Sequence, residues 1–212
     1  MELTILDFGN NAGRRASTNQ RLRSCILGPL PSHTDFSSLR STRLLAILDD
    51  DNLVASLRDH GVYLSHRKLH CRLVAEAQTI SAWAIFRSLR GDDRRKDHLL
   101  RSHWRVLAVP REMVMTVHGL CTKANADMDL CFAAGYLLRG GAFDTVLIGS
   151  GDGDLCVSIA RGIRRMPTMR GVYTLSVPGS TSSRITSASG SELFAGNFLV
   201  GRDLTEPATA ER

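Results

Sequence analysis

The sequence lacks any cysteine pattern that would define a disulfide framework or a zinc site. The five cysteines are widely scattered: Cys25, Cys71, Cys121, Cys131 and Cys156. Their number is odd, and no two of them have CxxC spacing. Structural zinc sites and disulfide frameworks need closely spaced or paired cysteines. Seven histidines are also spread along the chain, and we expect none of them to bind a metal. A reducing cytoplasm is the setting that this cysteine usage favours.

Long apolar runs are missing as well. No stretch reaches the roughly 20 apolar residues that cross a bilayer, and no apolar signal-peptide core is present. The first 43 residues are rich in arginine and serine, as organelle transit peptides are, but Glu2 and Asp7 fall where such peptides avoid acids. We therefore expect a cytoplasmic protein without a membrane partner.

The positive charge of the chain is modest and evenly divided. The net charge is +6, and residues 1–43 carry half of it, with six arginines against Glu2, Asp7 and Asp35. The run Arg94-Arg95-Lys96 is typical of a solvated helix face. A weakly basic surface around an acidic pocket would suit a nucleic-acid substrate.

A chain of 212 residues suits one domain with an extension. Residues 1–43 show no sustained periodicity and contain Pro29 and Pro31, so we predict a disordered extension there. Residues 44–204 form the predicted domain, and residues 205–212 a disordered tail.

Strand and helix patterns alternate through the predicted domain. We expect strands at 44–48, 79–86, 104–109, 145–148, 172–177 and 198–200, and helices at 53–60, 66–78, 92–102, 123–138 and 153–163. Alternation of this kind predicts an α/β fold: a three-layer α/β/α Rossmann-like sandwich around a central parallel sheet.

Acids follow two of the apolar strands directly. Leu44 to Leu48 leads into Asp49, Asp50, Asp51 and Asn52, and the simplest interpretation of Asp50 and Asp51 is as exposed acids near the start of a helix. Three adjacent acids repel one another, so a cation or basic neighbours would relieve them. Asn52 is placed either to cap the helix or to hold a substrate.

The second acidic turn reads Gly149-Ser150-Gly151-Asp152-Gly153-Asp154. A dinucleotide fingerprint fits poorly because Asp154 replaces its last glycine, and an EF-hand lacks its later ligands. Two readings stay open: Asp152 and Asp154 form a turn and cap the next helix, or they bind a divalent cation.

A third acidic pair lies near the start of the helix that we expect to open at Lys123. Asp127 and Asp129 are two residues apart, about 200° around a helix, so they cannot both face one point. We choose Asp127 for the pocket. If the three acidic segments, each at the start of a predicted helix, converge at one edge of the sheet, their carboxylates are suitable ligands for Mg²⁺ or Mn²⁺. At least one of these crowded acids should then have a raised pKa.

The three motifs together resemble the NYN domain of the PIN-like nuclease superfamily. They are Ile47-Leu48-Asp49-x-x-Asn52, Lys123-x-x-x-Asp127-x-Asp129-Leu130 and Ser150-Gly151-Asp152-Gly153-Asp154, in the family's order. The resemblance implies a PIN-like fold and a metal-dependent endoribonuclease that hydrolyses RNA with Mg²⁺ or Mn²⁺. Carried over by position, the catalytic and metal-binding acids are Asp49, Asp127, Asp152 and Asp154, and Asn52, Lys123 and Ser150 support substrate.

Two other classes stay open beside this hydrolase. One is a non-catalytic RNA-binding or regulatory module that keeps the acidic turn. The other is a phosphatase-like or nucleotide-binding α/β domain, suggested by Asp49-x-Asp51. For RNA contacts, the candidate cations are Lys123, Arg161, Arg164 and Arg165. A homo-oligomer is compatible with the sequence.

Overall fold

The computed structural model describes residues 28–88, 93–110, 112–116, 119–123 and 126–208. Six strands form one parallel sheet in the order β4-β3-β1-β7-β8-β9. They span Arg43–Asp49 (β1), Thr79–Ser88 (β3), Arg105–Pro110 (β4), Thr145–Gly149 (β7), Gly171–Ser176 (β8) and Gly196–Leu199 (β9). All six predicted strands are therefore confirmed, with end points shifted by up to two residues.

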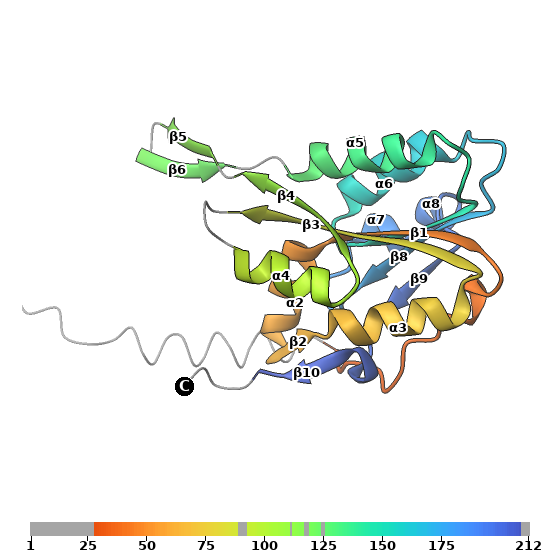
Figure 1. The fold of residues 1–212 in the computed structure, drawn as a ribbon, viewed down its shortest axis with the longest axis horizontal. Helices are drawn as coiled ribbons and strands as arrows, with labels where there is room; N and C mark the ends of the chain where they lie inside the picture. The colour runs from red at the N-terminus through yellow and green to blue at the C-terminus, as the bar shows by residue number, and fades with distance from the viewer. Residues whose placement is uncertain (1–27, 89–92, 111, 117–118, 124–125, 209–212) are drawn as a thin grey trace, which may run out of the picture.

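The helices cover both faces of the sheet (Figure 1). One layer holds α2 (Asp50–Asp59), α3 (His66–Glu76) and α4 (Asp93–Arg101), and the other holds α5 (Ala126–Leu138), α6 (Gly153–Ile163) and α7 (Ser183–Thr186). A short helix, α8 (Ala188–Ser191), follows α7. The predicted three-layer α/β/α sandwich is thus the observed fold.

The two cores show why these residues form this sheet. In β1, Leu44, Ala46 and Leu48 pack against the first helix layer, and Leu45 and Ile47 pack against the second. Successive strand residues point to opposite faces, so a strand buried on both sides must be apolar throughout. This is why the predicted strands are continuous apolar runs.

The strand order reverses between β1 and β7. Counted along the chain, the sheet reads 3-2-1-4-5-6, the order of a doubly wound fold. The connections from β1 and β7 leave in opposite directions, which opens a crevice at the carboxyl ends of these two strands. Leu48 lies beside Gly149 there. The prediction that both strands are central, parallel and end on one edge is confirmed.

Two small antiparallel pairs lie outside the main sheet. The β5–β6 hairpin (Glu112–Thr116 and Gly119–Lys123) was not predicted. Lys123 ends β6, so the expectation that it opens the next helix was wrong by three residues, since α5 begins at Ala126.

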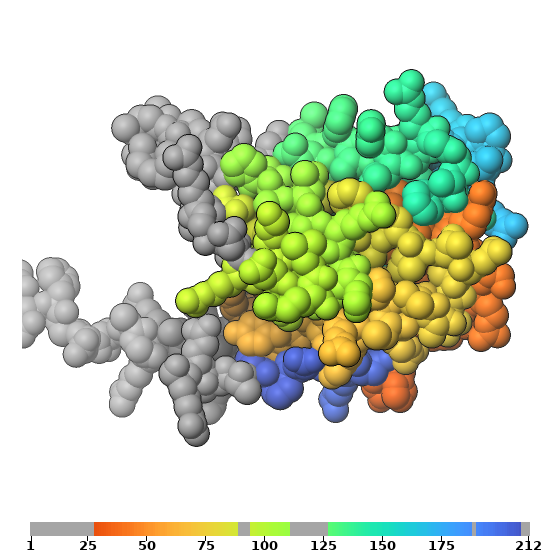
Figure 2. All heavy atoms as spheres, in the orientation of Figure 1, coloured from red at the N-terminus to blue at the C-terminus, as the bar shows by residue number. Residues whose placement is uncertain are grey.

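The predicted tail was also wrong in part. Thr205–Pro207 forms β10, which pairs with β2 (Val62–Leu64). Figure 2 shows this C-terminal segment, in blue, lying against the orange and yellow residues of the first helix layer. Residues 209–212 lie outside the described part of the chain.

The described part of the predicted extension is packed rather than disordered. Phe36 and Leu39, around a 3-10 turn (η1, Ser37–Leu39), are fully buried in the first core. Their two apolar side chains stand alone in a polar stretch and give no periodic signal. The segment also joins the end of the domain: Thr34 Oγ1 donates to the Leu199 carbonyl at 3.0 Å, and Arg202 N–H donates to the Pro31 carbonyl at 2.8 Å. We call these contacts, between residues 31–34 and 199–203, the seam. Residues 1–27 lie outside the described residues.

None of the helices in the described ranges is long and apolar enough to cross a membrane.

Candidate functional site

The candidate site lies at the crevice between β1 and β7. Asp49 is the last residue of β1 and also the N-cap of α2. Its Oδ1 accepts a hydrogen bond from Asn52 N–H at 3.2 Å, and its Oδ2 accepts one from Ser150 Oγ at 3.3 Å. An acid is favoured at this cap because its oxygen satisfies a free N–H of the first helical turn.

Ser150 and Asn52 join the two acidic turns. Ser150 Oγ also accepts from Asp152 N–H at 3.1 Å, so this hydroxyl links Asp49 to the second turn. Asn52 Oδ1 accepts from Gly151 N–H at 2.8 Å. A side chain at Gly151 would lie 2.6 Å from the Ser180 carbonyl oxygen, which explains the glycine. Ser150 is fully buried and positions the two turns relative to each other, while the substrate contact expected of it stays a prediction.

Asp152 caps α6. Its Oδ1 accepts from Asp154 N–H at 2.8 Å and from Leu155 N–H at 3.4 Å. The capping interpretation of this turn is therefore confirmed for Asp152. Its Oδ2 has no hydrogen-bond partner among the described residues, so capping leaves this oxygen available to a ligand.

A cavity of about 300 Å³ opens beside these capping acids. Its lining residues are Asp49, Asp51, Asn52, Ala55, Ser56, Arg87, Asp127 and Asp152. Asp127 comes from the first turn of α5 and makes no hydrogen bond or ion pair with any described residue. We call Asp49, Asp127 and Asp152 the acid set, because all three line one cavity. The preference for Asp127 over Asp129 is confirmed, since Asp129 is not in the lining.

Asp127 reaches the cavity by a different route from the one expected. The strand before it is β6 of the hairpin, not a strand of the main sheet. Helix α5 instead packs against β1 and β3. The Asp127 carboxylate therefore reaches the cavity because α5 packs on the sheet, and not because a third strand of the main sheet leads into α5.

Asp154 does not join the acid set. Its side chain is 76% exposed and pairs with Arg184, and it is absent from the cavity lining. Asp152 faces the crevice from the N-cap position, whereas Asp154 already belongs to the helix and points elsewhere. The expectation that Asp154 lies together with the other acids is therefore not met, and its catalytic and metal-binding role stays a prediction. The substrate contact of Lys123, at the end of β6, stays a prediction.

Burial and neighbouring charges raise the pKa of Asp49 to about 6 from an ordinary value of 3.8. Loss of solvent is the largest cause, and the negative charges of Asp127 and Asp51 add to it. The hydrogen bonds from Asn52 and Ser150 act in the opposite direction. The expectation that at least one acid of the cluster has a raised pKa is thus confirmed.

This raised pKa predicts how stability varies with pH. The folded protein holds the Asp49 proton up to pH about 6, whereas the unfolded chain releases it near 3.8. Stability should therefore fall as pH rises through this window, by about 3 kcal/mol for such a shift. Asp49→Asn should remove this dependence and be more stable than wild type at pH 8, with little difference at pH 4. Urea unfolding in EDTA from pH 4 to 8 measures it.

Asp154→Asn is the matched control for that experiment, because Asp154 is exposed and outside the cavity. It should keep the wild-type pH profile. An Asp49→Asn profile parallel to that of wild type would contradict the assignment.

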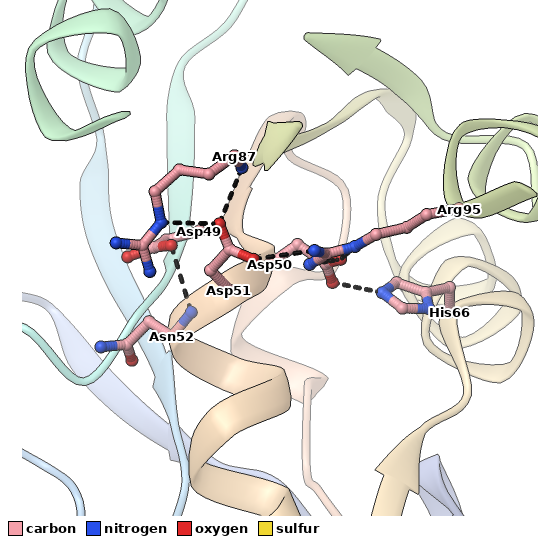
Figure 3. A network of polar contacts seen from close by, with 7 residues as sticks. All are labelled: Asp49, Asp50, Asp51, Asn52, His66, Arg87 and Arg95. Carbon is pink, nitrogen blue, oxygen red and sulfur yellow. Dashed lines mark hydrogen bonds and ion pairs between the residues drawn. The ribbon is translucent and has the colours of Figure 1, made fainter. Parts of the chain in front are cut away.

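A network of basic residues surrounds the three adjacent acids at the start of α2 (Figure 3). Asp51 Oδ2 accepts from the backbone N–H of Arg87 at 2.7 Å and from its Nε at 3.0 Å. Arg95 donates to both Asp50 and Asp51. The two arginines come from the end of β3 and from α4, so elements distant in sequence neutralise this turn.

Asp50 is the most buried acid of the network, at 1% exposure. His66 Nε2 lies 2.5 Å from its Oδ1, and Arg95 Nη2 lies 2.5 Å from its Oδ2. Burial alone would raise its pKa, but the bonds and charges of His66 and Arg95 outweigh burial and keep it low. The interpretation of Asp50 as an exposed acid at a helix start does not hold.

The network also corrects the interpretation of the run Arg94-Arg95-Lys96. The Arg95 side chain is only 25% exposed: it lies over the Phe86 ring, 4.5 Å from its centroid, and pairs with two acids. A further signal was missed nearby, since His66 and His70 stand four residues apart on α3, a spacing found in metal sites. Here His66 contacts Asp50, and the His70 ring lies 5.5 Å from that of His103.

The donors of the acid set suit a hard divalent cation. Within the described ranges, no three histidine, cysteine, aspartate or glutamate side chains are close enough together to form a metal site. The oxygens that line the cavity are nevertheless the donor type that Mg²⁺ and Mn²⁺ prefer. Asp152 Oδ2 and both oxygens of Asp127 have no described partner, which leaves them available as ligands.

Comparison with known proteins defines the fold class but not an activity. No family model matches the sequence, and no curated protein gives a significant match. A protein of unknown function from Vibrio parahaemolyticus has a TM-score of 0.63 at 16% identity, covering 79% of this chain and 98% of that one. The class is therefore a doubly wound α/β/α sandwich.

Two further structures are similar only at a low level. MurG from Acinetobacter baumannii has a TM-score of 0.40 at 11% identity, with 81% of this chain and 43% of that chain covered. BdcA from E. coli has a TM-score of 0.28 at 9% identity, with 76% and 100% covered. Neither similarity bears on function.

Proposed function

We propose that this protein is a Mg²⁺- or Mn²⁺-dependent endoribonuclease of the NYN type that hydrolyses RNA phosphodiester bonds. One observation carries the proposal: the carboxylates of Asp49, Asp127 and Asp152 line a single cavity at the switch point of a doubly wound sheet. Ligands of such folds bind in this crevice. The motif resemblance to the NYN domain, which spans the same residues, supports it from the sequence.

The residues of the cavity have separate roles in this proposal. Divalent cations, when bound, supply an activated water and stabilise the charge of the attacked phosphate. Asp49, Asp127 and Asp152 would hold them, and the Ser150 hydroxyl joins the Asp49 carboxylate to the backbone N–H of Asp152. Asn52 lines the same cavity and joins its two turns, so the substrate contact predicted for it stays a proposal.

Cations near the acid set favour an anionic substrate. Arg87 lines the cavity, and its Nε is held by Asp51 while its two terminal nitrogens have no described partner. Arg161 and Arg184 line a second cavity of about 360 Å³ beside α6. Positive side chains at these places would contact the phosphates of RNA.

We also propose a cytoplasmic setting. Cys71, Cys131 and Cys156 are free thiols in the structure, and unpaired cysteines are usual in a reducing compartment.

The experiment that tests the function is incubation of the protein with labelled single-stranded and structured RNA in Mg²⁺, Mn²⁺ or EDTA. We expect cleavage inside the chain with either cation and none in EDTA. Binding without cleavage across both cations and several RNA classes would overturn the nuclease and favour the non-catalytic RNA-binding module.

A further inference from the structure

Helix α5 exposes an apolar stripe that no described part of the chain covers. Met128 is 64% exposed, Phe132 78% and Tyr136 69%. The three residues follow one another at intervals of four, so they lie on one face of the helix. Large apolar side chains that are exposed in a row, rather than singly, mark a surface that binds a partner.

The opposite face of α5 already has its partners. Leu130, Ala134 and Leu138 are buried in the second core. Figure 1 shows α5 at the outer edge of the molecule, above α6, with its outer side free of other elements. The exposed stripe is therefore not needed to hold the helix on its own domain.

The helix surface is complementary to itself when two copies run antiparallel. If the two-fold axis lies level with Ala134, residue n of one helix lies opposite residue 268 − n of the other helix. Phe132 then faces Tyr136 of the second copy, since 132 + 136 = 268. Asp129 faces Arg139 in the same register, since 129 + 139 = 268. One symmetric arrangement thus forms two aromatic pairs and two ion pairs at once.

The charges of this register are available for pairing. Asp129 and Arg139 are both exposed, and neither side chain has a hydrogen bond or ion pair with a described residue. If the helical wheel is continued by one residue beyond the end of α5 to include Arg139, the residues Met128, Asp129, Phe132, Tyr136 and Arg139 fall within about 100°. They therefore form one face rather than a belt around the helix.

Gly135 lies at the edge of this face, about 20° beyond Met128 on the helical wheel, and close to the level of the two-fold axis. It is exposed, and a side chain there would meet no atom within 4 Å. The bare backbone leaves room for the aromatic rings of a second helix to approach closely. Phenylalanine and tyrosine at the centre of an interface, with charges at its rim, is the usual composition of a binding surface.

We infer that two copies of this chain form a symmetric homodimer through antiparallel α5 helices, centred on Phe132 and Tyr136. The two Asp127 residues then lie at opposite ends of the paired helices, about 21 Å apart along the axis. The dimer presents two acid cavities on either side of one interface.

Sedimentation equilibrium or light scattering of the full chain tests the dimer. Wild type should have twice the 23.2 kDa mass of one chain, and Phe132→Glu should be monomeric. Leu100→Glu is the matched control, because Leu100 is a 48% exposed apolar residue on α4; it should remain dimeric. Each variant should keep its circular dichroism, since these side chains are exposed.

A charge exchange tests the register itself. Asp129→Arg or Arg139→Asp alone should weaken the dimer at least about tenfold, because each places like charges opposite one another. The double exchange should restore it. A monomeric wild type, a dimer that survives Phe132→Glu, or a double exchange no better than the single ones would overturn the proposal. All three results can be obtained whether or not the protein cleaves RNA.

Discussion

Asp49→Asn should lower the rate of metal-dependent RNA cleavage by at least about a thousandfold, and Asp152→Asn should do the same. Both residues line the cavity in which the cation is proposed to bind, and a lost ligand removes several kcal/mol of transition-state stabilisation. RNA binding should largely survive, because the proposal assigns the phosphate contacts to arginines rather than to these acids. Single-turnover cleavage and fluorescence anisotropy measure the two effects separately.

Asp154→Asn is the decisive control for this prediction. The sequence motif includes Asp154 with Asp152, but the structure pairs it with Arg184 outside the cavity. It should keep cleavage within a few-fold of wild type. Equal loss in Asp154→Asn and Asp152→Asn would show that the cavity is not the site. Cation-stimulated cleavage that persists in the Asp49→Asn, Asp152→Asn double variant would point to the same conclusion.

Arg95→Met should destabilise the protein by about 3 kcal/mol, the low end of what removing one partner of a buried ion pair costs. Asp50 is 1% exposed and would keep only His66 as a partner. Methionine retains the contact with Phe86, so the loss reports the missing charge. For a domain of this size the midpoint of thermal unfolding should fall by about 10 °C.

The neighbouring arginine provides the comparison. Arg94 is exposed on the same helix, and its side chain makes no ion pair with a described residue. Arg94→Met should change the midpoint by no more than about 2 °C. Similar midpoints for the two variants would mean that the ion pair seen between α4 and α2 does not hold the folded protein together.

The part of the site that the sequence predicts is the part that local chemistry determines. Asp49 and Asp152 each follow a short apolar strand and precede a helix, and an acid at that position caps the helix. Since parallel strands end on one edge, two such turns must meet if their strands are neighbours. Asp127 could be chosen over Asp129 for a similar reason, because helical geometry lets only one of them face the cavity.

The remaining part depends on tertiary packing, which leaves little local signal. Nothing near Asp50 in the sequence indicates that Arg95, 45 residues later, would pair with it in the core. Arg87 reaches the cavity because β3 lies beside β1. The burial of Ser150 has the same origin, since packing of β7 beside β1 places its hydroxyl between the Asp49 carboxylate and the Asp152 N–H.

The seam has a consequence for how the protein is made on the ribosome. Thr34 leaves the ribosome early, but its partner Leu199 follows 165 residues later. At about 5–20 residues per second, this interval lasts roughly 8 to 33 seconds. During that time Phe36 and Leu39 can find the first core, since α2 and α3 follow them closely, and Thr34 can accept from Arg72 of α3, whereas the partners of residues 31–34 in 199–203 do not yet exist. Closing the seam is thus a late event of synthesis, after β1 and β7, which lead to Asp49 and Asp152, are complete.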